Sequence, residues 1–371
     1  MGEQTPDEFD ITDARKIYRP ESVGIGDYPM DSHAVRPKAA DDTQTFGEGE
    51  WYLVQRTPWH QLPFGVCVPK KLDNVFVTTA VSSTHVSFGT YRMEPVRMAF
   101  GQAAGIAAKI AIQFHKTGRE VPARQIQDEL LPHTANPYGD PNIVLHYFSD
   151  VPPTHKYYRA IQYLASRGFL PDADSDNKFL PDKPVTPAEL QDWLNRLGTR
   201  ANPVKLIRSG KKPPIDIPLY APSYMGSVKA YKFALLRVRQ TATVNRADFL
   251  FNLWMVLQYG PEQGANPINP YTDVKEPPHG GNIAGIFVSQ ICILHECGID
   301  SRLWDSWGAY APDGRLRLQP NKPITRGEAF AAFYIAQIGL GPLFNDHPID
   351  GVNGRYVPPA PKYTSVSVDS R

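Results

Sequence analysis

The sequence has few cysteines and no excess of charge of either sign. Its three cysteines, Cys67, Cys292 and Cys297, form no CxxC motif and no Cys/His pattern with zinc spacing. We therefore expect neither a disulfide framework nor a metal site. Lysine plus arginine number 39 and aspartate plus glutamate number 38, so the formal net charge is +1. This balance does not favour binding to nucleic acid or to anionic lipid.

The sequence also lacks a long apolar run. The longest candidate, from about Phe100 to Ile112, is interrupted by two glycines, a glutamine and a lysine, whereas a membrane helix needs roughly 18 or more apolar residues. The N-terminal segment MGEQTPDEFDITDAR has no apolar core of a secretory signal. We expect no membrane span, and either a cytoplasmic chain or an export signal on another polypeptide segment.

Proline is abundant, and the remaining composition is that of a globular protein. The 36 prolines among 371 residues are about twice the usual share, which predicts short elements separated by fixed turns. Hydrophobic residues make up 42% and charged residues 21% of the chain. This length leaves room for two domains at about 150 residues each.

Residues 51–115 predict two strands followed by a helix. The strands are expected at Trp51–Val54 and at the β-branched run Asn74–Thr79. The helix should begin near Glu94–Pro95 and run to about His115 before a glycine ends it. Its small residues at positions 101, 104, 105 and 108 let a backbone approach closely, either in a packed core or at a ligand.

An internal repeat begins beyond residue 145. Phe148-Ser-Asp-Val151 and Tyr271-Thr-Asp-Val274 each precede a predicted helix, at 157–167 and at 283–297, a Gly-Phe or Gly-Ile pair, and a similar proline-containing loop. A segment from about 227 to 257 is a degenerate middle copy. Because a helix pair alone cannot bury its apolar face, three stacked copies are expected to form one unit.

A capping box ends the proline-containing loop in each of the two outer copies and begins the helix that follows it. Thr186 with Glu189, and Thr325 with Glu328, stand three residues apart at the start of a predicted helix. In this motif the hydroxyl accepts the backbone N–H three residues on, and the carboxylate accepts the N–H of the cap. Both second helices are therefore expected to begin at these residues.

The run NVFVTTAVSSTHVSFGTYRMEPVRMAFGQAAGIAA, with GIGDYPMDSH and QRTPWHQLPFGVCVPKKLDNVFV before it, resembles the C-terminal part of bacterial FAD-dependent oxidoreductases of the xanthan-lyase-associated type. The resemblance covers roughly residues 20–132. It implies a glutathione-reductase-type fold, in which this strand and helix return to the flavin and the helix N-terminus faces its pyrimidine end. A positive helix end would stabilise an anionic reduced flavin.

The resemblance also indicates candidate site residues. His85, and second His33, are candidate acid/base residues, because imidazole titrates near neutrality; a structural histidine bonded to a backbone carbonyl is the alternative for each. Arg92 is a candidate for flavin or for substrate, or it pairs with Glu94 at the helix start. The candidate cofactor-binding residues are Ser83, Thr84, Arg92, Met93, Glu94 and Gly101.

The chain departs from that family because it has no GxGxxG βαβ unit for the ADP moiety. Gly24-Ile-Gly26 is followed by Asp-Tyr-Pro, which does not open a helix. The dinucleotide-binding half is therefore expected on a second subunit or on a cleaved N-terminal fragment; the third explanation is a relic that binds no flavin. We favour the first two.

The repeats resemble S-layer homology modules, which form three-repeat helical bundles on bacterial surfaces and bind cell-wall polysaccharide through the Arg of a T-R-x-E segment. The matching residues are Arg246 and Arg326, whereas Pro187 stands there in the first copy. Trp304 and Trp307 would suit sugar stacking, although contact with a partner chain is the commoner use of exposed tryptophan. Docking to a subunit is thus an alternative role for the repeats.

We therefore predict an α+β to α/β oxidoreductase part in residues 1–140 that is the C-terminal portion of a flavoprotein without a complete Rossmann unit. A mostly helical domain of three repeats follows in 145–340, at about 147–198, 222–258 and 270–339, and then an extended tail in 341–371. The predicted function is hydride transfer from an unidentified small organic substrate to FAD in an extracytoplasmic heteromeric or cleaved complex. The alternative is a non-catalytic cell-surface scaffold that binds wall polysaccharide.

Overall fold

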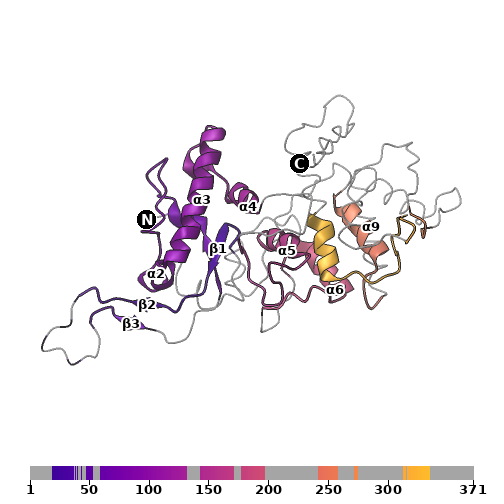
Figure 1. The fold of residues 1–371 in the computed structure, drawn as a ribbon, viewed down its shortest axis with the longest axis horizontal. Coiled ribbons are helices and arrows are strands. Elements are labelled where there is room, and N and C mark those ends of the chain that lie inside the picture. The colour runs from indigo at the N-terminus through magenta and orange to yellow at the C-terminus, as the bar shows by residue number, and fades with distance from the viewer. Residues whose placement is uncertain are drawn as a thin grey trace, which may run out of the picture. The chain divides into compact units, whose positions relative to one another are not determined.

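The computed structural model (Figure 1) describes residues 19–36, 38, 40, 43, 47–52, 59–131, 143–170, 177–196, 241–257, 271–274, 312–314 and 316–334. The contacts divide the chain into two compact units. The first comprises Met1–Asp182 with Gln191–Pro218, and the second comprises Lys183–Leu190 with Leu219–Arg371.

In its described residues, the first unit is a mixed α/β structure with two small antiparallel sheets. Strand β1 (Ser22–Gly26) pairs with β4 (His60–Pro63), and β2 (Asp31–Ser32) pairs with β3 (Trp51–Tyr52). The helices described there are η2 (Phe64–Cys67), α2 (His85–Tyr91), α3 (Glu94–Gln113), η3 (Gly118–Glu120), α4 (Ala123–Leu130) and α5 (Tyr158–Ala165).

Helix α3 packs against β1 and forms the centre of the core (Figure 1). Its side chains Phe100, Ala103 and Ala107 are fully buried together with Val23 of β1 and Leu62 of β4. The predicted start of this helix is confirmed, and its observed end lies two residues before the predicted one. Proline in the first turn fits the start because the missing N–H has no partner within a helix at that place.

The strand predicted over residues 74–79 is wrong for this structure, in which these described residues form no strand. Asn74 has a φ of 58°, which is the left-handed region and not extended backbone. Val77 donates its N–H to the Cys67 carbonyl oxygen (2.9 Å), and this single bond does not continue as a ladder. β-branched residues favour extended backbone, but a strand also needs a neighbour that pairs with it.

The other predicted strand is present in shorter form. Within the predicted Trp51–Val54, β3 covers Trp51–Tyr52, and residues 53–54 lie outside the described residues.

The chain around Leu145 joins the first repeat to the α/β part within the first unit. Gln61 of β4 donates to the Leu145 carbonyl oxygen (2.8 Å), and Gln162 of α5 accepts the Leu145 N–H (2.8 Å). Arg167, after α5, forms an ion pair with Asp128 of α4 (2.7 Å). The described part of the first repeat up to Asp182 is therefore packed into this unit.

Three backbone hydrogen bonds form a closed ring in the second unit. Val244 donates to Val185 (2.8 Å), Val185 donates to Ile324 (2.9 Å), and Ile324 donates to Val244 (2.9 Å). A helix begins two residues after each of them: α6 (Pro187–Arg196), α9 (Arg246–Leu257) and a helix at 326–334. One residue from each predicted copy thus occupies an equivalent place in the ring.

The outer copies share a second feature, the aspartate of the F/Y-x-D-V segment. The Asp150 carboxylate accepts the N–H groups of residues 179 and 180 (2.8 and 2.7 Å), and the Asp273 carboxylate accepts those of residues 318 and 319 (2.8 Å each). The second residue of each pair has a positive φ, 56° and 52° respectively. Each aspartate therefore holds a strained turn in the same conformation.

Several predicted features lie outside the described residues. These are the helix at 283–297, Trp304, Trp307 and the tail 341–371. None of the helices that the structure describes has the length and hydrophobicity of a membrane span.

Candidate functional site

Two of the predicted site residues mark the ends of α2. His85 is its first residue and is exposed, and Arg92 is the C-cap that follows Tyr91. Thr84, the predicted N-cap, accepts the backbone N–H of Ser87 through its hydroxyl (3.3 Å). Thr84 therefore has a structural function at the start of the helix.

Strand β2 lies directly across α2. A Cβ added at Gly89 would collide with the carbonyl oxygen of Asp31, so only glycine permits this approach. The Asp31 carboxylate forms an ion pair with Arg92, and the Ser32 hydroxyl is hydrogen-bonded to Nε2 of His85. Arg92 was expected to pair with Glu94 if its role were structural; the pairing in the structure is with Asp31.

The second candidate histidine lies next to this contact. His33 follows Ser32 and is exposed, and its carbonyl oxygen accepts the Ser32 hydroxyl hydrogen (3.3 Å). The fold thus brings the two predicted histidines to one place, where Ser32 contacts both. The contact to His33 is with its backbone.

The start of α3 retains polar atoms without partners. Met93 is the N-cap and provides no side-chain hydrogen bond to the helix. In the first turn of α3 the Arg97 Nε is buried without a hydrogen-bond partner, and so is the hydroxyl of Ser83, which lies before α2. Buried polar atoms in native proteins nearly always have partners, so each of these two atoms is able to bind a further group or water.

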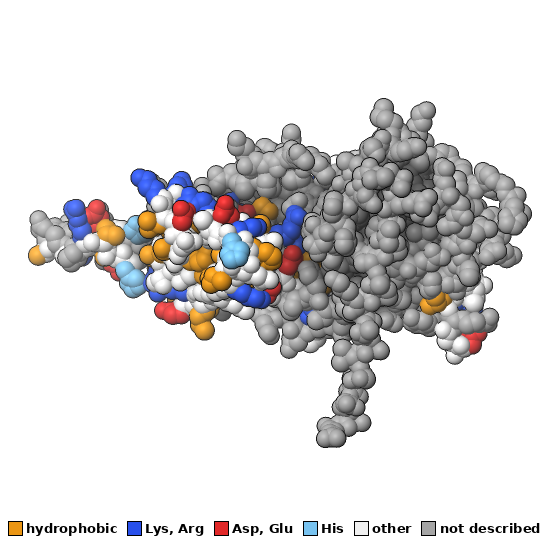
Figure 2. Space-filling model, turned by 90° about the horizontal axis from the view of Figure 1, so that it is seen from above, with side chains coloured by type: hydrophobic (Ala, Val, Ile, Leu, Met, Phe, Trp, Pro, Cys, Tyr) orange, Lys and Arg blue, Asp and Glu red, His pale blue; other side chains and the backbone are white. Residues whose placement is uncertain are grey.

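The outward face of α3 mixes apolar residues and glycines with polar ones such as Gln102 and Lys109. Met98 and Ile112 are 74% and 78% exposed, and a Cβ at Gly101 or Gly105 would meet no atom within 4 Å. Ala104 lies on the buried face instead. Hydrophobic side chains are visible between charged ones on the described surface of this region (Figure 2).

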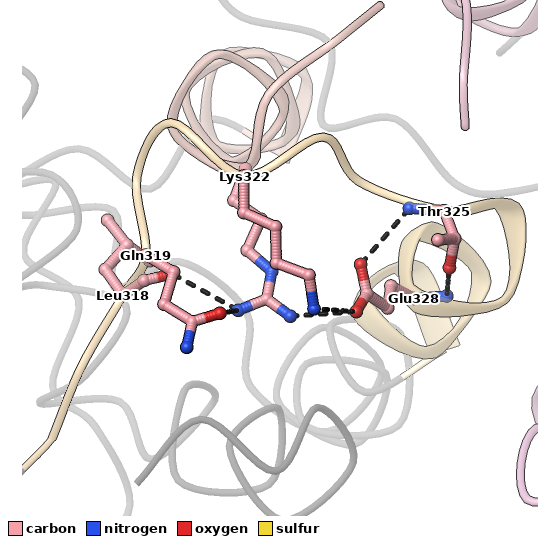
Figure 3. A network of polar contacts seen from close by, with 6 residues as sticks. Leu318, Gln319, Lys322, Thr325 and Glu328 are labelled. Atoms are coloured by element: carbon pink, nitrogen blue, oxygen red, sulfur yellow. Dashed lines mark hydrogen bonds and ion pairs between the residues drawn. The ribbon is translucent and has the colours of Figure 1, made fainter. Parts of the chain in front are cut away.

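The predicted glycan-binding arginines are buried at the starts of their helices. Arg246 is fully buried, and its guanidinium forms an ion pair with Glu328 (2.8 Å) and a hydrogen bond with the Gln319 side chain (3.1 Å). Figure 3 shows the surrounding network, in which Lys322 also contacts the Glu328 carboxylate (3.5 Å). Glu328 completes the predicted capping box by accepting the Thr325 N–H (3.1 Å).

Arg326 makes the corresponding contact to the first copy. It is 2% exposed and pairs with Glu189 (2.7 Å). Burial raises the pKa of Glu189, and the Arg326 charge opposes that rise. Thus Arg246 of the middle copy pairs with Glu328 of the third copy, and Arg326 of the third copy pairs with Glu189 of the first. Pro187 stands where the first copy would supply its arginine.

The described residues of the first unit fit the flavin ring of FAD and not its ADP moiety. The unpartnered Ser83 and Arg97 atoms and the uncapped start of α3 offer hydrogen-bond donors and a positive helix end to the carbonyl edge of a flavin ring. Gly24 and Gly26 lie within β1, and among the described residues no glycine-rich turn leads from a strand into a helix. The ADP moiety therefore has no site in the described part.

Sequence reasoning missed the partners of the predicted residues. Asp31 and Ser32 lie within the GIGDYPMDSH motif, but nothing in the sequence indicated their contacts with α2, which is more than 50 residues away in the chain. The signal available was local: Gly89, the sixth residue of the T-H-V-S-F-G segment, is the one glycine of α2.

The fold is thus a mixed α/β part whose α2–α3 region suits a flavin ring, followed by a helical repeat domain. Residues 1–130 match the family model of the FAD dependent oxidoreductases, and residues 147–190 match that of the S-layer homology domain. An S-layer homology domain indicates association with a cell surface. No match was found among curated proteins.

Proposed function

We propose that this chain is the part of a flavin-dependent oxidoreductase that completes the flavin and substrate site, and that a second subunit or a cleaved N-terminal fragment holds the ADP moiety. The observation that carries the proposal is that His85, Arg92 and the uncapped start of α3 lie on two successive helices in a part that matches FAD dependent oxidoreductases. The absence of a GxGxxG motif from the sequence supports the second polypeptide segment.

The outward face of α3 supports the same proposal. A glycine in an exposed helix interior costs about 1 kcal/mol relative to alanine, and α3 carries two, Gly101 and Gly105, with Met98 and Ile112 on the same face. Such a face suits close contact with another backbone. The occupant that we propose is the missing dinucleotide-binding half, because the matched family requires it and the described residues do not supply it.

The mechanism assigns proton chemistry to the protein. When bound, FAD would accept a hydride equivalent from the substrate. Ser83, Arg97 and the start of α3 would hold the flavin ring, and His85 would accept the proton that a substrate hydroxyl or amine releases. His85 is the exposed first residue of the otherwise mostly buried helix α2, so a small organic substrate would have access to its ring.

The test is the visible absorption spectrum of natively purified protein, together with a denaturing gel. A flavin spectrum and a second band or fragment are the expected result, and in that complex His85→Gln should slow flavin reduction by roughly 10²-fold or more. The matched control is His115→Gln, which removes an exposed histidine after the end of α3. A colourless, single-chain protein contradicts the proposal.

The S-layer homology match favours a second function, retention at the cell surface. In that proposal the repeats bind wall polysaccharide, or dock the enzyme to a surface partner, with or without catalysis by the first unit. Sedimentation with purified cell walls tests it, and a chain that stays in the supernatant contradicts it.

A further inference from the structure

We propose that Ser32 and Asp31 of β2 are positioning residues that fix His85 and Arg92 for their function at the flavin site. This inference rests on the proposed function, because that function makes His85 the proton-accepting residue. Neither Ser32 nor Asp31 touches the substrate in the proposal; each acts through a residue of α2.

The spacing on α2 is the first step. His85 and Arg92 are seven residues apart, which is about two helical turns, so they lie on one face. Gly89 lies on that face between them, and the backbone of Asp31 rests on it. The Thr90 hydroxyl adds a hydrogen bond to the Tyr28 carbonyl oxygen (3.2 Å) just before β2. The strand is therefore held against α2 at several points.

The second step concerns the Ser32 hydroxyl, which has only one hydrogen to donate. In the proposal that hydroxyl donates to the His33 carbonyl oxygen (3.3 Å), and its lone pairs accept from the ring of His85. This arrangement assigns the proton to Nε2 of His85 and leaves Nδ1 without one in the neutral ring. Fixing the proton on Nε2 gives the ring one defined basic nitrogen, which is what a proton acceptor requires.

The ion pair of Asp31 is the third step. Its partner, Arg92, is about one fifth exposed and stands two residues before the start of α3. The Arg92 Nε is buried without a hydrogen-bond partner. Asp31 thus orients a guanidinium group that retains an unpartnered Nε–H and belongs to the residue just before the N-cap of α3.

The test is the exchange of the His85 ring proton, measured by NMR on the full chain with ¹⁵N-labelled histidine. The signal is assigned by its loss in His85→Gln. In the wild-type chain we expect a protected Nε2–H signal. Ser32→Ala should make its exchange with solvent about fivefold faster or more, the factor that corresponds to one hydrogen bond of about 1 kcal/mol, and Ser32→Thr should restore the protection.

The matched control is Ser87→Ala, which removes a buried hydroxyl of α2 that bonds to Thr84. It should leave the exchange rate unchanged. An unprotected ring proton in the wild-type chain, an unchanged rate in Ser32→Ala, or an equal loss in Ser87→Ala overturns the proposal. Because the measurement needs no flavin, its outcome is independent of whether the chain binds FAD.

Discussion

Arg326 and Glu189 form a buried ion pair that should be strongly coupled in stability. Their side chains are 3% and 9% exposed, and Nε lies 2.7 Å from the carboxylate. Removing one partner of a buried pair costs about 3–5 kcal/mol, whereas replacing both by apolar residues of similar size is often neutral. Arg326→Met and Glu189→Met should therefore each destabilise the chain by that amount.

The double variant should lose much less than the sum of the two single losses. We expect a coupling energy of at least about 2 kcal/mol from urea unfolding of the four proteins. The matched control is the exposed pair Lys109–Glu129, at 2.9 Å and with side chains 59% and 45% exposed, for which a coupling below about 1 kcal/mol is expected. Additive losses at Arg326 and Glu189 would refute the buried-pair reasoning.

The loss in Arg326→Met should also depend on pH. Burial raises the pKa of Glu189 and Arg326 lowers it, so without the arginine the folded-state pKa rises further above the unfolded value. The folded state then binds a proton more tightly than the unfolded state. The variant should regain stability as the pH falls through that raised pKa, and an unchanged loss from neutral to acid pH would contradict this.

Sedimentation with cell walls separates this structural role from the glycan role that the resemblance implies. The single variant Arg326→Met is unsuitable, because unfolding alone would abolish retention. The double variant Arg326→Met with Glu189→Met lacks the guanidinium but should keep the fold. If it is retained on walls like the wild-type chain, Arg326 acts within the core; loss of retention in the folded double variant assigns the arginine to the glycan.

Four further predictions concern the first unit. Burial lowers the pKa of His146 to about 4, below its unfolded value, so the unfolded state binds more protons between those two values. The free energy of unfolding should therefore fall by about 2 kcal/mol from neutral pH to about pH 5, as measured by urea unfolding. His146→Phe should reduce this pH-dependent loss. Gly101→Ala should stabilise the chain by roughly 0.5–1 kcal/mol in thermal unfolding, because a Cβ at residue 101 meets no atom, yet it should lower the yield of any flavin complex. Gly89→Ala should destabilise the chain, because the Asp31 carbonyl oxygen occupies the space that the added Cβ needs. Gln162→Leu should cost about 2 kcal/mol or more in urea unfolding, because the Leu145 and His146 N–H groups lose their acceptor.

The sequence predicted the elements whose causes are local. The start of α3 follows from Pro95 and the spacing of its apolar residues, and the starts of α6 and of the helix at 326–334 follow from the Thr and Glu of each cap. The strand at 74–79 failed because pairing depends on a neighbour that the local sequence does not reveal. A β-branched run fixes a preference for extended backbone and not the ladder itself.

The candidate site was predictable in its residues and not in its contacts. His85 and Arg92 were found from motif and residue type, but their partners on β2 are separated from them by 53 and 61 residues. The arginines of the repeats show the same limit. Their positions were correctly matched between copies, whereas their burial against glutamates of other copies depends on how the repeats close around the ring of residues 185, 244 and 324.

The sequence divides the two matched regions near residue 140, whereas the structure joins them there by buried hydrogen bonds. The oxidoreductase match ends at residue 130 and the S-layer homology match begins at 147, and composition placed the division near 140. Yet the Leu145 carbonyl oxygen accepts bonds from Ser22 of β1 (3.2 Å) and Gln61 of β4 (2.8 Å), while its N–H donates to Gln162 of α5 (2.8 Å). These groups are buried, so cutting the chain at the apparent linker would leave polar atoms of both parts without partners. The first repeat up to Asp182 is therefore a structural part of the α/β unit, although its sequence belongs to the second matched family.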